Sequence, residues 1–200
     1  MFDDLLRMVQ EYSIINIEFY IVSGGLVSII KGSNLVQKYF SSVYGCVIDD
    51  VGDPRMLRRV MRAVTFTEKT RYLFEINKGL SPKQTGQNPY LVNTEIPQSR
   101  RRVPFSNMVY IGDGLTDIPC FSLVKHYGGI CFGVFDPTDH SKAKRALREF
   151  LRPGRVIGMH SPRYGPDDDL GSLIRASVSS LCNRIVVMQQ TAEYADGNDR

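Results

Sequence analysis

The sequence has few residues of the kinds that form disulfide frameworks or metal clusters. It contains 4 cysteines and 3 histidines in 200 residues. The cysteines form no CxxC pair and do not cluster with the histidines; they are Cys46, Cys120, Cys131 and Cys182. Such spacing favours neither a zinc site nor a disulfide framework. We therefore expect reduced thiols in a cytoplasmic protein.

The chain also lacks a long apolar run and a basic N-terminal segment. Its longest apolar runs, at residues 19–22 and 185–188, are far shorter than the roughly 18 residues that a membrane span needs. The only charged side chains among the first four residues are acidic, whereas a secretory signal begins with basic residues. We expect no membrane-spanning segment and no membrane partner.

Neither sign of charge dominates. Lys and Arg number 25 against 21 Asp and Glu, a net charge of +4, and the basic residues are scattered except at residues 55–62 and 100–102. This distribution predicts no nucleic-acid partner. With 42% hydrophobic and 23% charged residues, the composition is that of an ordinary globular domain.

Hydrophobic periodicity indicates helices and strands that alternate along the chain. Helical spacing predicts an opening helix from Phe2 to Val9 and a long final helix from Leu170 to Ile185. Strands are expected at residues 17–22, 43–48, 108–111 and 130–135, with a further short strand at 155–159. This alternation predicts an α/β fold with a mostly parallel sheet. We expect one domain over residues 1–190, with a surface excursion at 81–107 and a flexible tail at 191–200.

The first candidate site is Ser23-Gly24-Gly25, directly after the apolar segment 17–22. A hydroxyl and accessible backbone N–H groups between a strand and a helix suit a phosphate group. The alternative is a tight turn in which Ser23 caps the following helix.

The second candidate is Gly112-Asp113-Gly114-Leu115-Thr116-Asp117, which places two carboxylates four residues apart after a buried-type strand. Carboxylate oxygens are ligands that Mg²⁺ prefers. A hairpin at Asp113-Gly114 is the alternative, but no strand pattern follows it. Asp117 as a helix N-cap ahead of Pro119 stays open, and is compatible with a metal role.

The third candidate is Lys69, near the start of a helix that Thr65 and Glu68 mark with capping-box spacing. A cation there opposes the helix dipole by a few tenths of a kcal/mol to about 1 kcal/mol, so an anionic group nearby should compensate it. A simple pairing of Lys69 with Glu68 or Glu75 is the alternative.

In this order, the three segments resemble motifs of the haloacid dehalogenase-like (HAD) hydrolase superfamily, closest to its phosphoserine-phosphatase-like members. The Ser23 segment is similar to the second motif of that family, Lys69 to the third, and the segment from Gly112 to Asp117 to the fourth. The resemblance spans roughly residues 17–135 and implies a Rossmann-like core with a mostly parallel sheet.

Carried over from the family, the residues have separate roles in phosphoryl transfer. The resemblance implies that Ser23 and the Gly24 N–H bind the phosphate, Lys69 neutralises it, and Asp113 with Asp117 positions Mg²⁺. Such cations offset the repulsion between a phosphate dianion and an attacking carboxylate.

One family feature is missing. The reaction of the family begins with an aspartate, in an Asp-x-Asp motif N-terminal to the serine motif, that forms an aspartyl-phosphate. Residues 1–16 contain no such motif, and the Asp-x-Asp at Asp167 and Asp169 lies in a downstream polar loop. The chain thus resembles a member without its first, central strand, its nucleophile and its N-terminal cap. Strand edges left unpaired by that loss would invite an oligomer or a strand-donating partner.

Two classes of function follow. The leading expectation is a Mg²⁺-dependent phosphatase of a small phosphorylated metabolite, of which this chain is a fragment that is inactive as given. The alternative is a noncatalytic HAD-like module that binds phosphate, metal or a partner. A Rossmann nucleotide-binding domain is a weaker option because neither glycine turn supplies G-x-G-x-x-G. Arg100, Arg101 and Arg102 are expected to form a solvated basic loop, with contact to an anionic substrate as the alternative.

Overall fold

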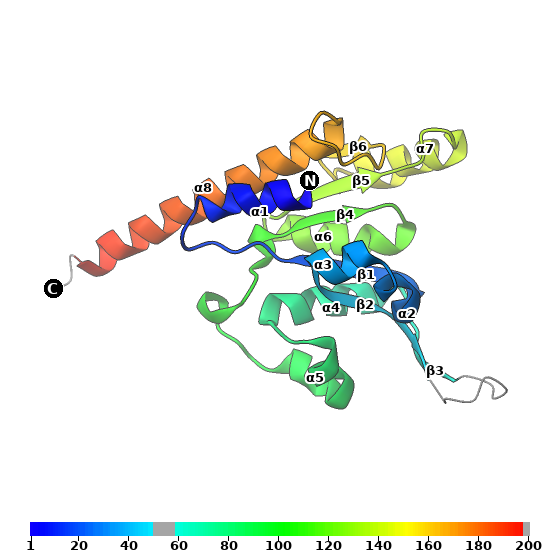
Figure 1. The fold of residues 1–200 in the computed structure, drawn as a ribbon, viewed down its shortest axis with the longest axis horizontal. Helices are drawn as coiled ribbons and strands as arrows, with labels where there is room; N and C mark the ends of the chain where they lie inside the picture. The colour runs from blue at the N-terminus through cyan, green and yellow to red at the C-terminus, as the bar shows by residue number, and fades with distance from the viewer. Residues whose placement is uncertain (50–58, 198–200) are drawn as a thin grey trace. The chain divides into compact units, whose positions relative to one another are not determined.

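The computed structural model describes residues 1–49 and 59–197 (Figure 1). The chain divides into two compact units, one made of Met1–Ile17 with Phe132–Arg200 and the other of Glu18–Cys131. The expectation of one core domain over residues 1–190 stays a prediction. Each unit is described by itself.

The first unit is built on a long C-terminal helix. Its elements are α1 (Phe2–Gln10), most of β5 (Ile130–Val134), α7 (His140–Ala146), a π-helical turn (Leu147–Leu151), β6 (Gly158–His160) and α8 (Asp169–Gly197). The helix α1 packs against α8, where the Arg175 guanidinium donates to the Asp4 carboxylate at 2.7 Å and the Tyr12 hydroxyl donates to Asn183 Oδ1 at 2.9 Å.

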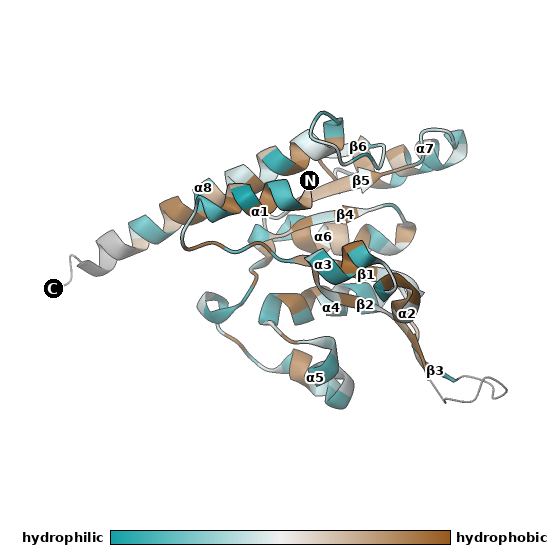
Figure 2. Ribbon diagram, in the orientation of Figure 1, coloured by the Kyte–Doolittle hydropathy of each residue, from teal (hydrophilic) through white to brown (hydrophobic). Residues whose placement is uncertain are grey.

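The sequence predicted the helices α1 and α8 of this unit. Leu5 and Val9 of α1 are buried, and so are the apolar residues of α8 that recur at helical spacing, which are Leu170, Ile174, Val178 and Leu181. Figure 2 shows brown and teal segments alternating along α8, as one buried and one solvated face require. The helix does not end near Thr191, where a flexible tail was expected, but continues to Gly197.

The second unit contains all three candidate motifs. Its elements are β1 (Phe19–Leu26), α2 (Val27–Lys31), α3 (Asn34–Tyr39), β2 (Phe40–Ile48), β3 (Val60–Arg62), α4 (Phe66–Lys78), α5 (Pro82–Gln87), β4 (Val109–Gly112) and α6 (Ile118–His126). The sequence did not predict β3. The first half of the basic stretch 55–62 lies outside the described residues.

The strands belong to two small sheets, β1, β2 and β3 in one and β4, β5 and β6 in the other. β1 runs parallel to β2, with Ile21 opposite Val43, and β5 runs parallel to β6, with Phe132 opposite Gly158. β3 is antiparallel to β2. The fold is therefore mixed α/β with mostly parallel pairing, as predicted, but β1 and β4 do not share one sheet.

The Ser23-Gly24-Gly25 segment lies inside β1 and not in a turn after it. The strand continues to Leu26, and its register against β2 shifts between Val22 and Leu26. The Gly25 N–H donates to Ser23 Oγ at 3.0 Å. Glycine lets the two strands approach closely here, because a Cβ on the neighbouring Gly45 would lie 2.7 Å from the Gly25 carbonyl oxygen.

The helix α4 has the limits that the sequence predicted. The Glu68 carboxylate accepts a hydrogen bond from the Thr65 N–H at 3.1 Å, as in a capping box. At the other end Gly79 has φ of 74°, the left-handed conformation that glycine adopts most readily after a helix. The buried face of α4 carries Lys69, Tyr72 and Glu75.

The excursion 81–107 is more ordered than its composition predicted. It contains α5 and 3₁₀ turns at Pro89–Asn93, Gln98–Arg100 and Phe105–Asn107. The C-terminal half of α4 holds it: Asn77 Nδ2 donates to the Val103 carbonyl at 2.8 Å, and Lys78 Nζ donates to the Val92 and Thr94 carbonyls at 2.6 and 2.7 Å. Hydrogen bonds from side chains of α4 thus hold this segment in place. A sequence pattern could have revealed only a periodic apolar face, which the segment does not have.

No described helix combines the length and the apolar character needed to cross a membrane. All four cysteines are free thiols, and Cys120, Cys131 and Cys182 are buried. Burial raises the pKa of Cys120 to about 11 and that of Cys131 to about 12, so these thiols are protonated at neutral pH.

The close approach of β1 and β2 leads to a stability prediction. We expect Gly45→Ala to lower the free energy of unfolding by about 1–3 kcal/mol, because the new methyl group forces the two strands apart. The matched control is Gly24→Ala, since a Cβ at Gly24 would meet nothing within 4 Å. Urea unfolding of both variants measures the difference, and equal midpoints would contradict the register described here.

Candidate functional site

A buried ion pair joins two of the three motifs. Lys69 Nζ donates to Asp117 Oδ1 at 2.7 Å, and the two side chains are 9% and 4% exposed. Lys69 comes from α4 and Asp117 from the 3₁₀ turn Leu115–Asp117 after β4, so the pair connects segments that are distant in the sequence. The anionic group that the position of Lys69 requires is therefore Asp117, and neither Glu68 nor Glu75.

The Asp117 carboxylate has further donors. The Tyr110 hydroxyl also donates to Oδ1 at 2.7 Å, and the Gly114 N–H donates to Oδ2 at 3.0 Å. Asp117 stands directly before α6, at the N-cap position, but its side chain does not cap that helix. Instead it closes the turn, and Gly112 makes room for it, because a Cβ there would lie 2.7 Å from Asp117 Cγ.

Tyr110 was not among the site residues predicted from the sequence. Burial, reinforced by Cys120 and Asp117, raises the pKa of its hydroxyl, so it remains a hydrogen-bond donor at neutral pH. The ring packs edge-on against Phe121 at 5.5 Å between centroids. The sequence did contain a signal that could have revealed this residue, because it is a tyrosine in the otherwise aliphatic strand Val109–Gly112.

The other predicted site residues lie in different surroundings. Asp113 is exposed in the same turn as Asp117. Ser23 is half-buried and Gly24 is exposed, both within β1. Among the described residues, no hydrogen bond or ion pair joins Ser23 to Lys69, Asp113 or Asp117. The structure thus connects Lys69 with Asp117, while the convergence of Ser23 on them stays a prediction.

As placed, these residues do not fit a Mg²⁺ ion. Both oxygens of Asp117 already accept hydrogen bonds, one of them from an ammonium group, and the residue is 3% exposed. Within residues 1–49 and 59–197, no three His, Cys, Asp or Glu side chains are grouped as metal ligands. Mg²⁺ is costly to dehydrate, so it needs several accessible oxygen ligands. In this turn, the carboxylate that it could readily reach is that of Asp113.

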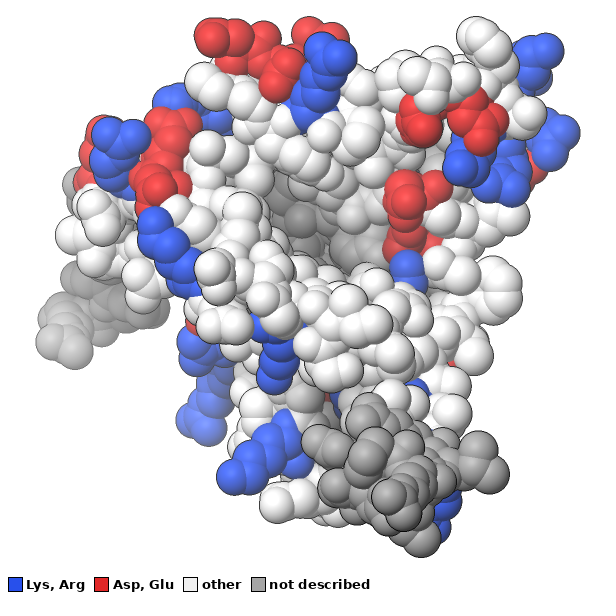
Figure 3. Space-filling view, turned by 45° about the vertical axis from the view of Figure 1, so that its right-hand side comes forward, with Lys and Arg blue, Asp and Glu red and all other residues white. Residues whose placement is uncertain are grey.

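The basic segment 100–102 is partly engaged within its own unit. Arg101 Nη1 donates to Asn77 Oδ1 at 2.7 Å, and Arg102 forms an ion pair with Glu18. In the view of Figure 3 the basic side chains are separated by uncharged surface and do not form one continuous patch. These contacts favour the interpretation of a structural and solvated loop over that of a substrate-binding cluster.

Comparisons with known proteins name no family. No family model matches the chain, and no solved structure matches it. An uncharacterized protein from Borreliella burgdorferi is 32% identical over 147 residues, which cover 62% of this chain and 48% of that protein. The chain thus spans about half the length of this curated relative.

The buried pair gives a direct stability test. We expect Lys69→Met to lower the free energy of unfolding by about 3–5 kcal/mol, because Asp117 would stay buried without its counter-charge. The double variant Lys69→Met, Asp117→Asn should lose less than Lys69→Met, since a neutral amide in place of the carboxylate needs no cation. The exposed Lys83 provides the matched control, and a loss in Lys69→Met no larger than that in Lys83→Met would contradict the pair.

The engagement of Asp117 leads to a prediction about metal binding. We expect the chain to bind Mg²⁺ weakly, and phosphate to strengthen that binding by supplying oxygen ligands. Calorimetric titration of the wild type and of the Asp113→Asn, Asp117→Asn double variant measures this. An unchanged Mg²⁺ affinity in the double variant would exclude the turn as the metal site.

Proposed function

We propose that the second unit is the phosphate-binding part of a HAD-like phosphohydrolase that acts on a small phosphorylated metabolite. The observation that supports the proposal most is the contact between Lys69 and Asp117. The resemblance assigns these residues to two separate motifs of one phosphate site, and motifs of a common site must meet in space. Two short motifs that matched by chance would have no reason to lie in contact.

The chemistry available to these side chains is binding and charge compensation. An ammonium group such as that of Lys69 has three donors, so it can hold Asp117 with one N–H and a phosphate oxygen with another. The backbone around Gly24 is open to a ligand, because nothing lies within 4 Å of its Cβ position. These groups stabilise a phosphoryl group but cannot attack it.

The proposed reaction therefore needs a nucleophile from outside the chain as given. In the family that this chain resembles, a carboxylate oxygen attacks phosphorus while the bond to the leaving oxygen breaks, and water then hydrolyses the aspartyl-phosphate. Among the described strands, β1 pairs only with β2 and lies at the edge of its sheet. That edge supports the proposal of a strand-donating segment or partner that carries the missing aspartate.

A noncatalytic module is the second candidate function. The saturation of Asp117 by Lys69, Tyr110 and Gly114 favours it, because a carboxylate so engaged has no role left in the chemistry unless the site rearranges. Such a module would bind phosphate or a partner without turnover. A cytoplasmic location is part of both proposals.

An activity assay separates the two candidates. We expect the chain as given to show no turnover of p-nitrophenyl phosphate with Mg²⁺, because it lacks the attacking carboxylate. The same chain expressed with its upstream coding sequence should gain turnover, and Lys69→Arg in that context should reduce it by at least about tenfold, the loss expected when an oriented charged donor is displaced.

Two outcomes would overturn parts of this proposal. Turnover by residues 1–200 alone would contradict the external nucleophile, because a group of this chain would then have to attack phosphorus. An upstream sequence without an apolar strand that ends in Asp-x-Asp, together with no turnover by the extended protein, would leave the noncatalytic module as the better proposal.

A further inference from the structure

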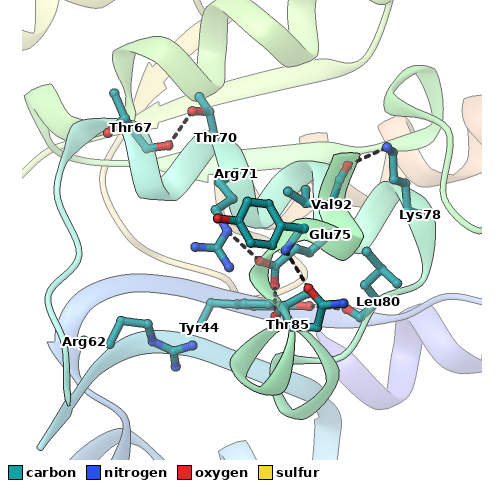
Figure 4. Close-up of polar contacts among 12 residues, drawn as sticks. Tyr44, Arg62, Thr67, Thr70, Arg71, Glu75, Lys78, Leu80, Thr85 and Val92 are labelled. Carbon is teal, nitrogen blue, oxygen red and sulfur yellow. Dashed lines mark hydrogen bonds and ion pairs between the residues drawn. The ribbon is translucent and has the colours of Figure 1, made fainter. Parts of the chain in front are cut away.

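A second cluster of polar groups lies along α4, and Figure 4 shows Arg62, Arg71, Glu75 and Thr85 from it together with Tyr44. Tyr72 is 0% exposed, and its hydroxyl has no hydrogen-bond partner among the described residues. The Tyr44 ring packs against it with 4.9 Å between ring centroids, but the Tyr44 hydroxyl donates to the Leu80 carbonyl at 3.0 Å. Because buried polar groups in folded proteins are nearly always hydrogen-bonded, the Tyr72 hydroxyl requires a partner that the described residues do not supply.

Two arginines lie near Tyr72 and have donors to spare. The Arg62 guanidinium carbon is 5.6 Å from the centroid of the Tyr72 ring, and its Nε donates to the Gly45 carbonyl at 3.1 Å. Arg71 uses its Nε to bind Glu75 Oε1 at 3.0 Å. Within the described part of the chain, no partner is recorded for the terminal nitrogens of either guanidinium, and these are the groups that bind oxyanions most strongly.

The carboxylates near Tyr72 are already engaged. Glu75 is fully buried, and its second oxygen accepts from the Thr85 hydroxyl at 2.9 Å. The pKa of Glu75 is raised, mainly because the side chain is buried. The hydrogen bond from Thr85 and the charge of Arg71 oppose this shift. Glu68, the other acidic side chain that acts on Tyr72, accepts from the Thr65 N–H in the cap of α4. Among the described residues, the terminal nitrogens of Arg62 and Arg71 and the Tyr72 hydroxyl are therefore left for an external acceptor.

We propose that Arg62, Arg71 and Tyr72 form a second oxyanion site, separate from the Lys69–Asp117 pair, that takes a phosphate group. Two guanidinium groups and one hydroxyl donate from three side chains, which suits the several oxygens of a phosphate better than the two of a carboxylate. The Arg71 side chain is 35% exposed, so a ligand can reach the cluster from solvent. The phosphate group comes either from free phosphate or from a phosphomonoester.

The test is a phosphate titration followed by NMR, at constant ionic strength with chloride as the reference anion. The probes are inorganic phosphate and phosphoethanolamine, which represent the two sources. We expect Arg62→Gln to weaken phosphate binding by about tenfold or more, the loss typical of one charge-assisted hydrogen bond, and Tyr72→Phe to weaken it severalfold. The matched control is Arg59→Gln, because the Arg59 side chain is 81% exposed.

A stability measurement keeps the test independent of misfolding. Since Tyr72→Phe removes a hydroxyl that has no partner in the described part of the chain, the ligand-free variant should unfold at the same or a higher temperature than the wild type. A lower unfolding temperature together with unchanged phosphate affinity would overturn the proposal, because it would assign the hydroxyl to a structural water.

The Ser23→Ala variant separates this site from the proposed function. If phosphate binding falls in Ser23→Ala but is unchanged in Arg62→Gln and Tyr72→Phe, the second site is refuted and the first is supported. If binding falls in Arg62→Gln and Tyr72→Phe but not in Ser23→Ala, the second site stands without the first. Phosphoethanolamine binding as tight as that of inorganic phosphate would identify a phosphomonoester as a ligand of the site.

Discussion

The buried pair of Lys69 and Asp117 is the constraint on which the second unit depends. A charge removed from water is tolerated only with a counter-charge and further hydrogen bonds, and here Tyr110 and the Gly114 N–H complete the surroundings of the carboxylate. The two charges come from α4 and from the turn after β4. If either element moved, one charge would stay buried without its counter-charge. The same constraint holds the predicted phosphate-binding lysine in one position.

The helix α4 extends this constraint to the rest of its unit. Its first half carries Lys69, and its second half carries Glu75, Asn77 and Lys78, which bind α5 and the carbonyl groups of the excursion 81–107. A segment without a periodic apolar face is thereby fixed by polar contacts to one rigid element.

The two clusters on α4 differ in how fully their charges are satisfied. At Asp117 every acceptor has a donor, which makes the pair stable but leaves little capacity for a metal ion. At Tyr72 the donors exceed the acceptors, since the terminal nitrogens of Arg62 and Arg71 and the tyrosine hydroxyl have no recorded partner in the described residues. An excess of donors indicates a site for an anion, and a saturated pair indicates a structural anchor that can also position a ligand.

The sequence by itself determined what depends on local signals: the helices α1, α4 and α8, the strands β2 and β4, and the need of Lys69 for an anionic partner. Periodicity and capping are short-range properties, so one segment suffices to reveal them. Only the tertiary structure decided that the partner is Asp117, that Tyr110 supports it, and that the Ser23 segment continues β1. Those outcomes depend on contacts between distant segments and on the register of neighbouring strands, which no single segment encodes.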